Sequence, residues 1–233
     1  MWIYRSAALA SATVTLLILR YWPQDGATGW ADTPSGLSLT GAFRDIARPA
    51  VALRLLCIGA INSAGISTMV LVALVFHATQ NRNAGDVALY AGLIAGWEVP
   101  VLLLLQPLIR HLPRTQVLAA GTALYCLQLA LLPVLADSPA VWGLTLLAGI
   151  GGSAIISIPI GYYQDMMAGK PGTAAALLAL QKLVGDVLAA LAFVAGTAIA
   201  GYQLTALLAC LIAALGASGL LLADRALKPA QIA

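Results

Sequence analysis

Residues 52–77 have the sequence ALRLLCIGAINSAGISTMVLVALVFH, and this apolar run decides the fold class. The hydrocarbon core of a bilayer is about 30 Å thick, so a helix that crosses it needs roughly 20 apolar residues. Arg54 stands near the start of the run and His77 ends it, which leaves the middle without charge. The stretch therefore predicts a transmembrane helix.

Six more apolar runs of similar length lie on either side of it. We expect them to span the membrane at about residues 3–22, 86–109, 115–135, 140–163, 173–199 and 202–223. The strands of a membrane barrel alternate apolar and polar residues, whereas these runs are apolar throughout. The sequence thus predicts an all-α membrane protein of about seven transmembrane helices.

The amino-acid composition supports the same class. The 233 residues are 61% hydrophobic and 9% charged, with a mean hydropathy of +0.92, whereas soluble domains carry roughly 25% charged residues. So few charges cannot cover a surface that faces water, and most of the surface must face lipid. The net charge of +3 includes no basic run, so nucleic acid is not an expected partner.

The connection at residues 23–49 differs from the other connections, which are short. It is polar and rich in Gly, Pro, Ser and Thr, and its part 39–47 has the pattern of an amphipathic surface helix. It separates a first helix at 1–22 from a bundle of six at 50–224, with a tail at 225–233. A cleaved signal peptide is the alternative for the first helix, but no small-residue cleavage site follows that run.

An asymmetric distribution of basic residues predicts the orientation. If the 23–49 linker is cytoplasmic, only Arg5 and Arg82 fall at the opposite ends of the spans. Nine basic residues fall at cytoplasmic ends: Arg20, Arg44, Arg48, Arg54, Arg110, Arg114, Lys170, Arg225 and Lys228. This bias places the C-terminus in the cytoplasm.

Polar residues inside the spans are the candidates for function, since a charge near the bilayer centre costs at least about 2.5–3.5 kcal/mol. Glu98 lies halfway along its span, between Gly96 and Pro100, which favour a bent or closely packed helix. A carboxylate at this depth can hold a proton or accept a substrate hydroxyl. The alternative is a neutral glutamic acid that only fixes helix packing.

Two other polar groups lie inside spans. Lys182 and Asp186 stand four residues apart and share a helix face, where they either serve in proton coupling or only neutralise each other for insertion. Asn62 lies near mid-depth beside small residues, where its amide either contacts a polar substrate or joins two helices. The sequence leaves both interpretations of each group open.

No sequence pattern indicates enzyme chemistry. Cys57, Cys126 and Cys210 lie in separate apolar runs, and no Ser/His/Asp set, metal-ligand spacing or nucleotide-binding loop occurs. We expect no enzymatic activity, no catalytic residues, no metal and no cofactor. A retinal protein is excluded because the last span, 202–223, contains no lysine.

Two stretches resemble a known family. Residues 90–100, YAGLIAGWEVP, and 161–174, GYYQDMMAGKPGTA, are similar to the C-terminal half of bacterial sugar efflux transporters, a branch of the major facilitator superfamily. In that family a Gly-x-Glu-[Ile/Val]-Pro core lies in the eighth helix, and the second string joins the tenth and eleventh. The resemblance covers roughly residues 45–225.

The resemblance implies that the seven helices correspond to helices six to twelve of a twelve-helix transporter in the bacterial inner membrane. The partners that it implies are the lipid bilayer, a small-molecule substrate and a further N-terminal helix bundle. The implied function is proton-coupled efflux of sugars or other small polar or amphiphilic compounds by alternating access.

Three sets of site residues are expected. The substrate-binding set is Glu98, Asn62 and Trp97. The proton-coupling set is Glu98, Asp186 and Lys182, of which the last two depend on depth and charge, not on the resemblance. The cytoplasmic gate is Gln164, Asp165 and Arg110. The alternative function is that of an incomplete or degenerate half-transporter that acts as a non-transporting membrane subunit.

Overall fold

The computed structural model describes residues 12–17, 20, 39–79 and 82–225. The chain divides into two compact units, residues 1–38 and 39–233. In the first unit, residues 12–17 and 20 are helical. The rest of the predicted first span, and most of the predicted linker, lie outside the described residues.

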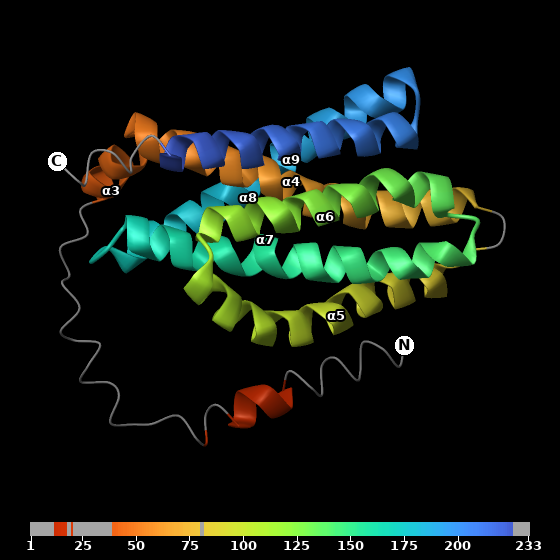
Figure 1. Ribbon diagram of the computed structural model, residues 1–233, viewed down its shortest axis with the longest axis horizontal. Helices are drawn as coiled ribbons and strands as arrows, with labels where there is room; N and C mark the ends of the chain where they lie inside the picture. Colours follow the sequence, from red (N-terminus) through yellow and green to blue (C-terminus); the bar gives the residue numbers. More distant parts are fainter. Residues whose placement is uncertain (1–11, 18–19, 21–38, 80–81, 226–233) are drawn as a thin grey trace. The chain divides into compact units, whose positions relative to one another are not determined.

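Six long helical segments of the second unit coincide with the other six predicted spans, and a short helix falls on the predicted surface helix at 39–47 (Figure 1). They are α3 (Leu39–Ile46), α4 (Pro49–Ala78), α5 (Ala84–His111), α6 (Arg114–Leu135), the 3₁₀ helix η2 (Pro139–Gly143), α7 (Leu144–Met166), α8 (Pro171–Ile199) and α9 (Tyr202–Arg225). Within the described residues, six helical segments are long and apolar enough to cross a membrane, with η2 and α7 forming one of them. The protein is therefore an all-α, multi-pass membrane protein.

Local sequence determines where these helices begin. At the start of α5 the Asn83 side chain accepts the N–H groups of Gly85 and Asp86 at 2.7 and 3.2 Å. The Asp86 carboxylate in turn accepts the Asn83 N–H at 2.9 Å, which completes a capping box. Proline is the first residue of α4 and of α8. Proline lacks a backbone N–H, and in the first turn of a helix that N–H would have no carbonyl partner within the helix. Gly201 turns the chain into α9 with a φ of +77°, which other residues rarely adopt.

The helix α4 lies at the centre of the bundle, and α5 lies at its edge. In the most apolar stretch of α4, 67% of the residues are buried inside the protein, whereas the share in α5 is 11%. The central helix packs against α8 and α9, and α6 packs against α7 and α9. The edge helix is held mainly by α7; it is visibly bowed (Figure 1) and contains Pro100 and Pro107.

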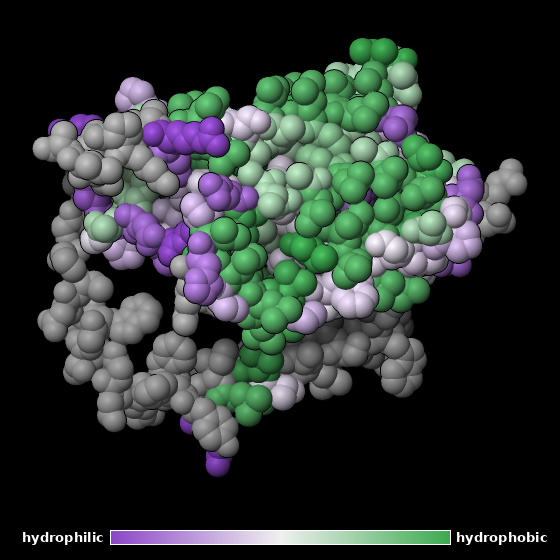
Figure 2. Space-filling view, in the orientation of Figure 1, coloured by the Kyte–Doolittle hydropathy of each residue, from purple (hydrophilic) through white to green (hydrophobic). Residues whose placement is uncertain are grey.

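Large apolar side chains cover much of the outside of the bundle. Leu103, Leu191 and Leu215 are 74%, 60% and 63% exposed. Figure 2 shows hydrophobic residues across the middle of one face, with the hydrophilic residues gathered toward its ends. A soluble protein rarely exposes so large an apolar surface, so this surface is the one that contacts lipid.

Candidate functional site

Glu98 lies halfway between the two ends of the bundle. We call the end at which α4, α6 and α8 begin the Arg54 end, and the opposite end the Arg82 end. Glu98 is the fifteenth of the 28 residues of α5, which places it about 20 Å from each end of that helix. The capping box at the start of α5 fixes the register that sets this depth.

Two glycines of α7 form the notch in which the Glu98 side chain lies. A Cβ atom at Gly149 would overlap Trp97 Cβ and lie 3.1 Å from the Ile94 carbonyl oxygen, so this glycine lets the two backbones approach. A Cβ atom at Gly152 would lie 2.7 Å from Glu98 Oε1 and 3.4 Å from Cε2 of Tyr125. We call this space, between Glu98, Tyr125 and Gly152, the Glu98 notch.

The Glu98 carboxyl has no polar partner in the part of the chain that the structure describes. The side chain is half-buried, and no hydrogen bond or ion pair to it occurs there. Buried carboxyls are usually paired or hydrogen-bonded, because an unpaired charge in an apolar medium is costly. The notch therefore leaves the carboxyl free to bind a proton or a hydroxyl group from outside the bundle.

Behind the notch, a chain of buried polar side chains joins α4, α5 and α6. Gln128 Nε2 donates to the Tyr90 hydroxyl at 3.0 Å, and Thr68 Oγ1 lies 3.4 Å from Gln128 Oε1. The Tyr125 hydroxyl lies beside Thr68 and continues the chain toward the notch. These groups satisfy one another, as buried polar groups in a membrane protein must, and hold the three helices in register.

A second polar group lies between α4 and α8. Asn62 is half-buried, and its Nδ2 is 2.8 Å from the position that a Cβ atom at Gly185 would occupy. Lys182 and Asp186 of α8 are both exposed. Although they are one helical turn apart, no ion pair joins them or ties either to another described residue.

The predicted substrate contacts thus fall into two places. Glu98 and Trp97 lie on α5 beside the glycines of α7, and Trp97 is 42% exposed. Asn62 lies against α8 beside Gly185, which precedes Asp186 in the sequence. The structure brings Asn62 and the α8 charges to one helix pair and Glu98 to another.

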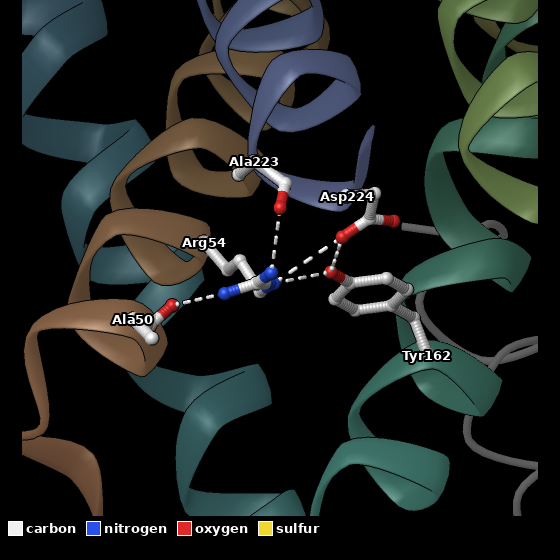
Figure 3. A network of polar contacts seen from close by, with 5 residues as sticks. All are labelled: Ala50, Arg54, Tyr162, Ala223 and Asp224. Atoms are coloured by element: carbon white, nitrogen blue, oxygen red, sulfur yellow. Dashed lines mark hydrogen bonds and ion pairs between the residues drawn. The ribbon is translucent and has the colours of Figure 1, made fainter. Parts of the chain in front are cut away.

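At the Arg54 end, one arginine ties three helices together (Figure 3). The Arg54 side chain is 6% exposed, and its Nε donates to the Tyr162 hydroxyl at 2.8 Å and to Asp224 Oδ1 at 3.3 Å. Its other nitrogens donate to the carbonyl oxygens of Ala50 and Ala223 at 2.7 and 3.0 Å. The Tyr162 hydroxyl donates to Asp224 at 2.8 Å, which closes the network across α4, α7 and α9.

The predicted gate residues lie at the same end. Asp165 accepts a hydrogen bond from Arg114 NH1 at 2.5 Å, which joins the end of α7 to the start of α6. Gln164 is exposed and lines a cavity of about 390 Å³ together with Arg114, Ser157 and apolar residues of α5 and α7. The side chain of Arg110 lies outside the described residues, so its predicted place in the gate stays a prediction.

At the Arg82 end, a different arginine contacts the connection that follows α6. Arg82 donates to the carbonyl oxygens of Ala136 and Ser138, both at 3.0 Å. Its guanidinium also lies over the rings of Phe76 and Trp142, 5.4 and 5.3 Å from their centroids. Arg82 thus joins the connection between α4 and α5 to the connection between α6 and α7.

Sequence reasoning missed the partners that the network around Arg54 requires. From the sequence, Arg54 was predicted only to be one of the charges that set the orientation, and no role was predicted for Asp224. The available signal was position: Arg54 lies in the second turn of α4, and Asp224 is the penultimate residue of α9. Opposite charges at neighbouring ends of antiparallel helices are natural partners.

Within the described residues, no group of three or more His, Cys, Asp or Glu side chains is placed to hold a metal ion. No protein-family model, curated protein or solved structure matches the chain. What sequence and structure together establish is an all-α, multi-pass membrane protein with unpaired charged residues at the depth of the bilayer.

Proposed function

We propose that the chain is the C-terminal half of a secondary active transporter of the major facilitator type, which exports a sugar or another small polar or amphiphilic compound in exchange for protons. One observation carries this proposal. Lys182 and Asp186 are exposed near the middle of α8, and neither has an ion-pair partner in the described bundle.

Lipid is an unsuitable neighbour for these two side chains. Asp186 is the sixteenth of the 29 residues of α8, so it lies near the bilayer centre. A charge there costs at least about 2.5–3.5 kcal/mol unless it faces water or another polar group. A second helix bundle, separated from this one by an aqueous cavity, supplies that environment in transporters built from two halves.

In the proposed mechanism, the two bundles rock about a site near the midplane. Glu98 binds the proton or a substrate hydroxyl, and Asn62 and Trp97 contact the substrate. Asp186 and Lys182 form the coupling pair, and Gln164, Asp165 and Arg110 gate the Arg54 end. That end faces the cytoplasm of a bacterial cell, in agreement with the basic residues Arg54, Arg114, Lys170 and Arg225 that lie there.

The test uses everted membrane vesicles from cells that make the protein, with Glu98→Gln introduced into its own gene. An imposed pH gradient should drive uptake of at least one compound from a panel of labelled sugars and amphiphiles, and Glu98→Gln should remove most of that uptake. Asp137→Asn is the matched control, because Asp137 is an exposed carboxylate at the Arg82 end. Membrane insertion is checked for each variant by extraction.

Two results would contradict the proposal. Uptake by Glu98→Gln vesicles at the wild-type rate would remove Glu98 from the mechanism. Deletion of the gene without change in the flux of any compound in the panel would favour a non-transporting membrane subunit.

A further inference from the structure

The helix α3 lies at the Arg54 end of the bundle, in contact with α4 and α8. Only Ala47 and Arg48 separate it from α4, whose first residue is Pro49. Its last turn continues into that connection, since the Ala47 N–H donates to the Phe43 carbonyl oxygen at 2.9 Å. It also contacts α8, which begins at the same end. A helix held beside two ends of membrane-spanning helices lies at the boundary between lipid and water.

The inner side of α3 holds its one acidic residue. Asp45 is 5% exposed and is ion-paired with Lys170, which lies in the connection between α7 and α8. Arg48 also contacts the Asp45 carboxylate, at 2.8 Å. The hydrogen bond from Lys170, helped by the charge of Arg48, holds the pKa of Asp45 below its ordinary value. The acid is therefore ionised at neutral pH and engaged with the bundle.

The outer side of α3 presents an aromatic ring and basic groups. Phe43 is 70% exposed, Arg44 is exposed, and the Arg48 side chain is 62% exposed. Phe43 and Arg44 adjoin in sequence, and Arg48 follows in the short connection to α4. An apolar ring flanked by cationic groups is the composition of helices that lie in the interface of a bilayer.

We propose that α3 is an interfacial helix whose partner is an anionic lipid leaflet. Phe43 inserts at the boundary between headgroups and acyl chains, and Arg44 binds lipid phosphates. Arg48 contacts Asp45 but keeps 62% of its side chain exposed, so it adds positive charge beside Arg44. Charge complementarity selects this partner: the acidic residue of α3 is taken up by Lys170, so the outer side attracts negative charge. The pairing with Lys170 also sets which side of the helix faces outward. This inference is independent of whether the protein transports.

The test places a probe at residue 43 of the whole chain in lipid nanodiscs. Phe43→Cys is labelled with an environment-sensitive fluorophore in a background in which Cys57, Cys126 and Cys210 are alanine. The quenchers are lipids with a nitroxide near the headgroup and, separately, aqueous iodide. Discs of zwitterionic lipid are compared with discs that contain an anionic phospholipid.

We expect lipid-borne quenching to exceed iodide quenching, and to increase when anionic lipid is present. Arg44→Gln with Arg48→Gln should abolish that increase, whereas the matched pair Arg44→Lys with Arg48→Lys should keep it. Lys170 still holds Asp45 in both double variants, so the helix stays docked.

Three outcomes would overturn the proposal. Equal quenching in the two kinds of disc would show that anionic lipid is not the partner. Strong quenching by iodide alone would place the helix in water, and protection from both quenchers would show that protein covers it. Because labelling itself removes Phe43, hydrogen exchange of residues 39–48 in the unlabelled chain provides a second measurement. Exchange should be slower in anionic than in zwitterionic discs, and equal rates would count against the interfacial helix.

Discussion

At the scale of single residues, two glycines of α7 position Glu98, because they have no side chains to fill the space beside it. Gly149 brings the backbone of α5 against α7, and Gly152 leaves room for the carboxyl group. The two glycines differ in what an added methyl group would meet. At Gly149 it meets backbone and a Cβ atom, and at Gly152 it meets the end of a flexible side chain.

This difference predicts different losses of stability for two alanine variants. In Gly149→Ala the helices must separate, so the free energy of unfolding should fall by about 1–3 kcal/mol. In Gly152→Ala only the Glu98 carboxyl must move, and a helical alanine recovers about 0.5–1 kcal/mol, so stability should change little. Unfolding in mixed micelles measures both.

The same pair tests the notch chemically. A hydrophobic carbodiimide reacts with protonated carboxyls in the membrane, and peptide mass spectrometry reports modification at Glu98. Gly152→Ala should react faster than the wild type, because its carboxyl is displaced from the notch. Equal losses of stability in the two variants, or unchanged labelling in Gly152→Ala, would contradict this account of the Glu98 notch.

Part of the candidate site was predictable from single residues. A glutamate in the middle of an apolar run is visible in the sequence, and the structure places Glu98 at that depth. Its surroundings were not predictable, because Gly152 and Tyr125 belong to other helices. The spacing of Lys182 and Asp186 allowed an ion pair, yet side-chain direction depends on neighbours that a helical wheel omits.

At the scale of helices, the network around Arg54 connects α4, α7 and α9 at one end (Figure 3). Its arginine is almost fully buried, while Asp224 retains 26% exposure. Removing one partner of such a pair leaves the other charge uncompensated, which costs more than the pair itself contributes.

A double-mutant cycle measures this coupling. Arg54→Met should lower the free energy of unfolding by about 3 kcal/mol, at the low end for a buried pair because Asp224 is partly solvated. Arg54→Met with Asp224→Asn should recover part of that loss. Tyr162→Phe, the control that keeps both charges, should cost about 1 kcal/mol. A double variant less stable than Arg54→Met would contradict the pairing.

The six described spans were predictable at this scale because hydropathy alone determines them. Most of their ends lie up to three residues outside the predicted ones, since caps and prolines extend helices beyond the apolar run. The predicted 86–109 became Ala84–His111 because Asn83 and Asp86 form a capping box. The bow of α5 depends on its packing against α7, which no local pattern contains.

At the scale of the whole molecule, each connection between the described spans lies at one of the two ends of the bundle. His111 is the exposed last residue of α5 at the Arg54 end, and Asp137 lies in an exposed connection at the Arg82 end. The excess of basic residues assigned to the Arg54 end predicts that it faces the cytoplasm.

Thiol labelling in intact cells tests this orientation. In the cysteine-free background, Asp137→Cys should react with a membrane-impermeant maleimide, and His111→Cys should react only after the cells are permeabilised. Both positions are exposed, so each serves as the accessibility control for the other. The reverse pattern would refute the predicted orientation.

The glycine notch has a consequence for biosynthesis. Glu98 leaves the ribosome about 50 residues before Gly152, which at roughly 5–20 residues per second is an interval of about 3–10 s. During that interval α5 has no α7 to pack against. The insertion machinery must therefore hold α5, with its glutamate, until α7 has been synthesised. Nascent chains that are stalled between the two helices should crosslink to that machinery through α5.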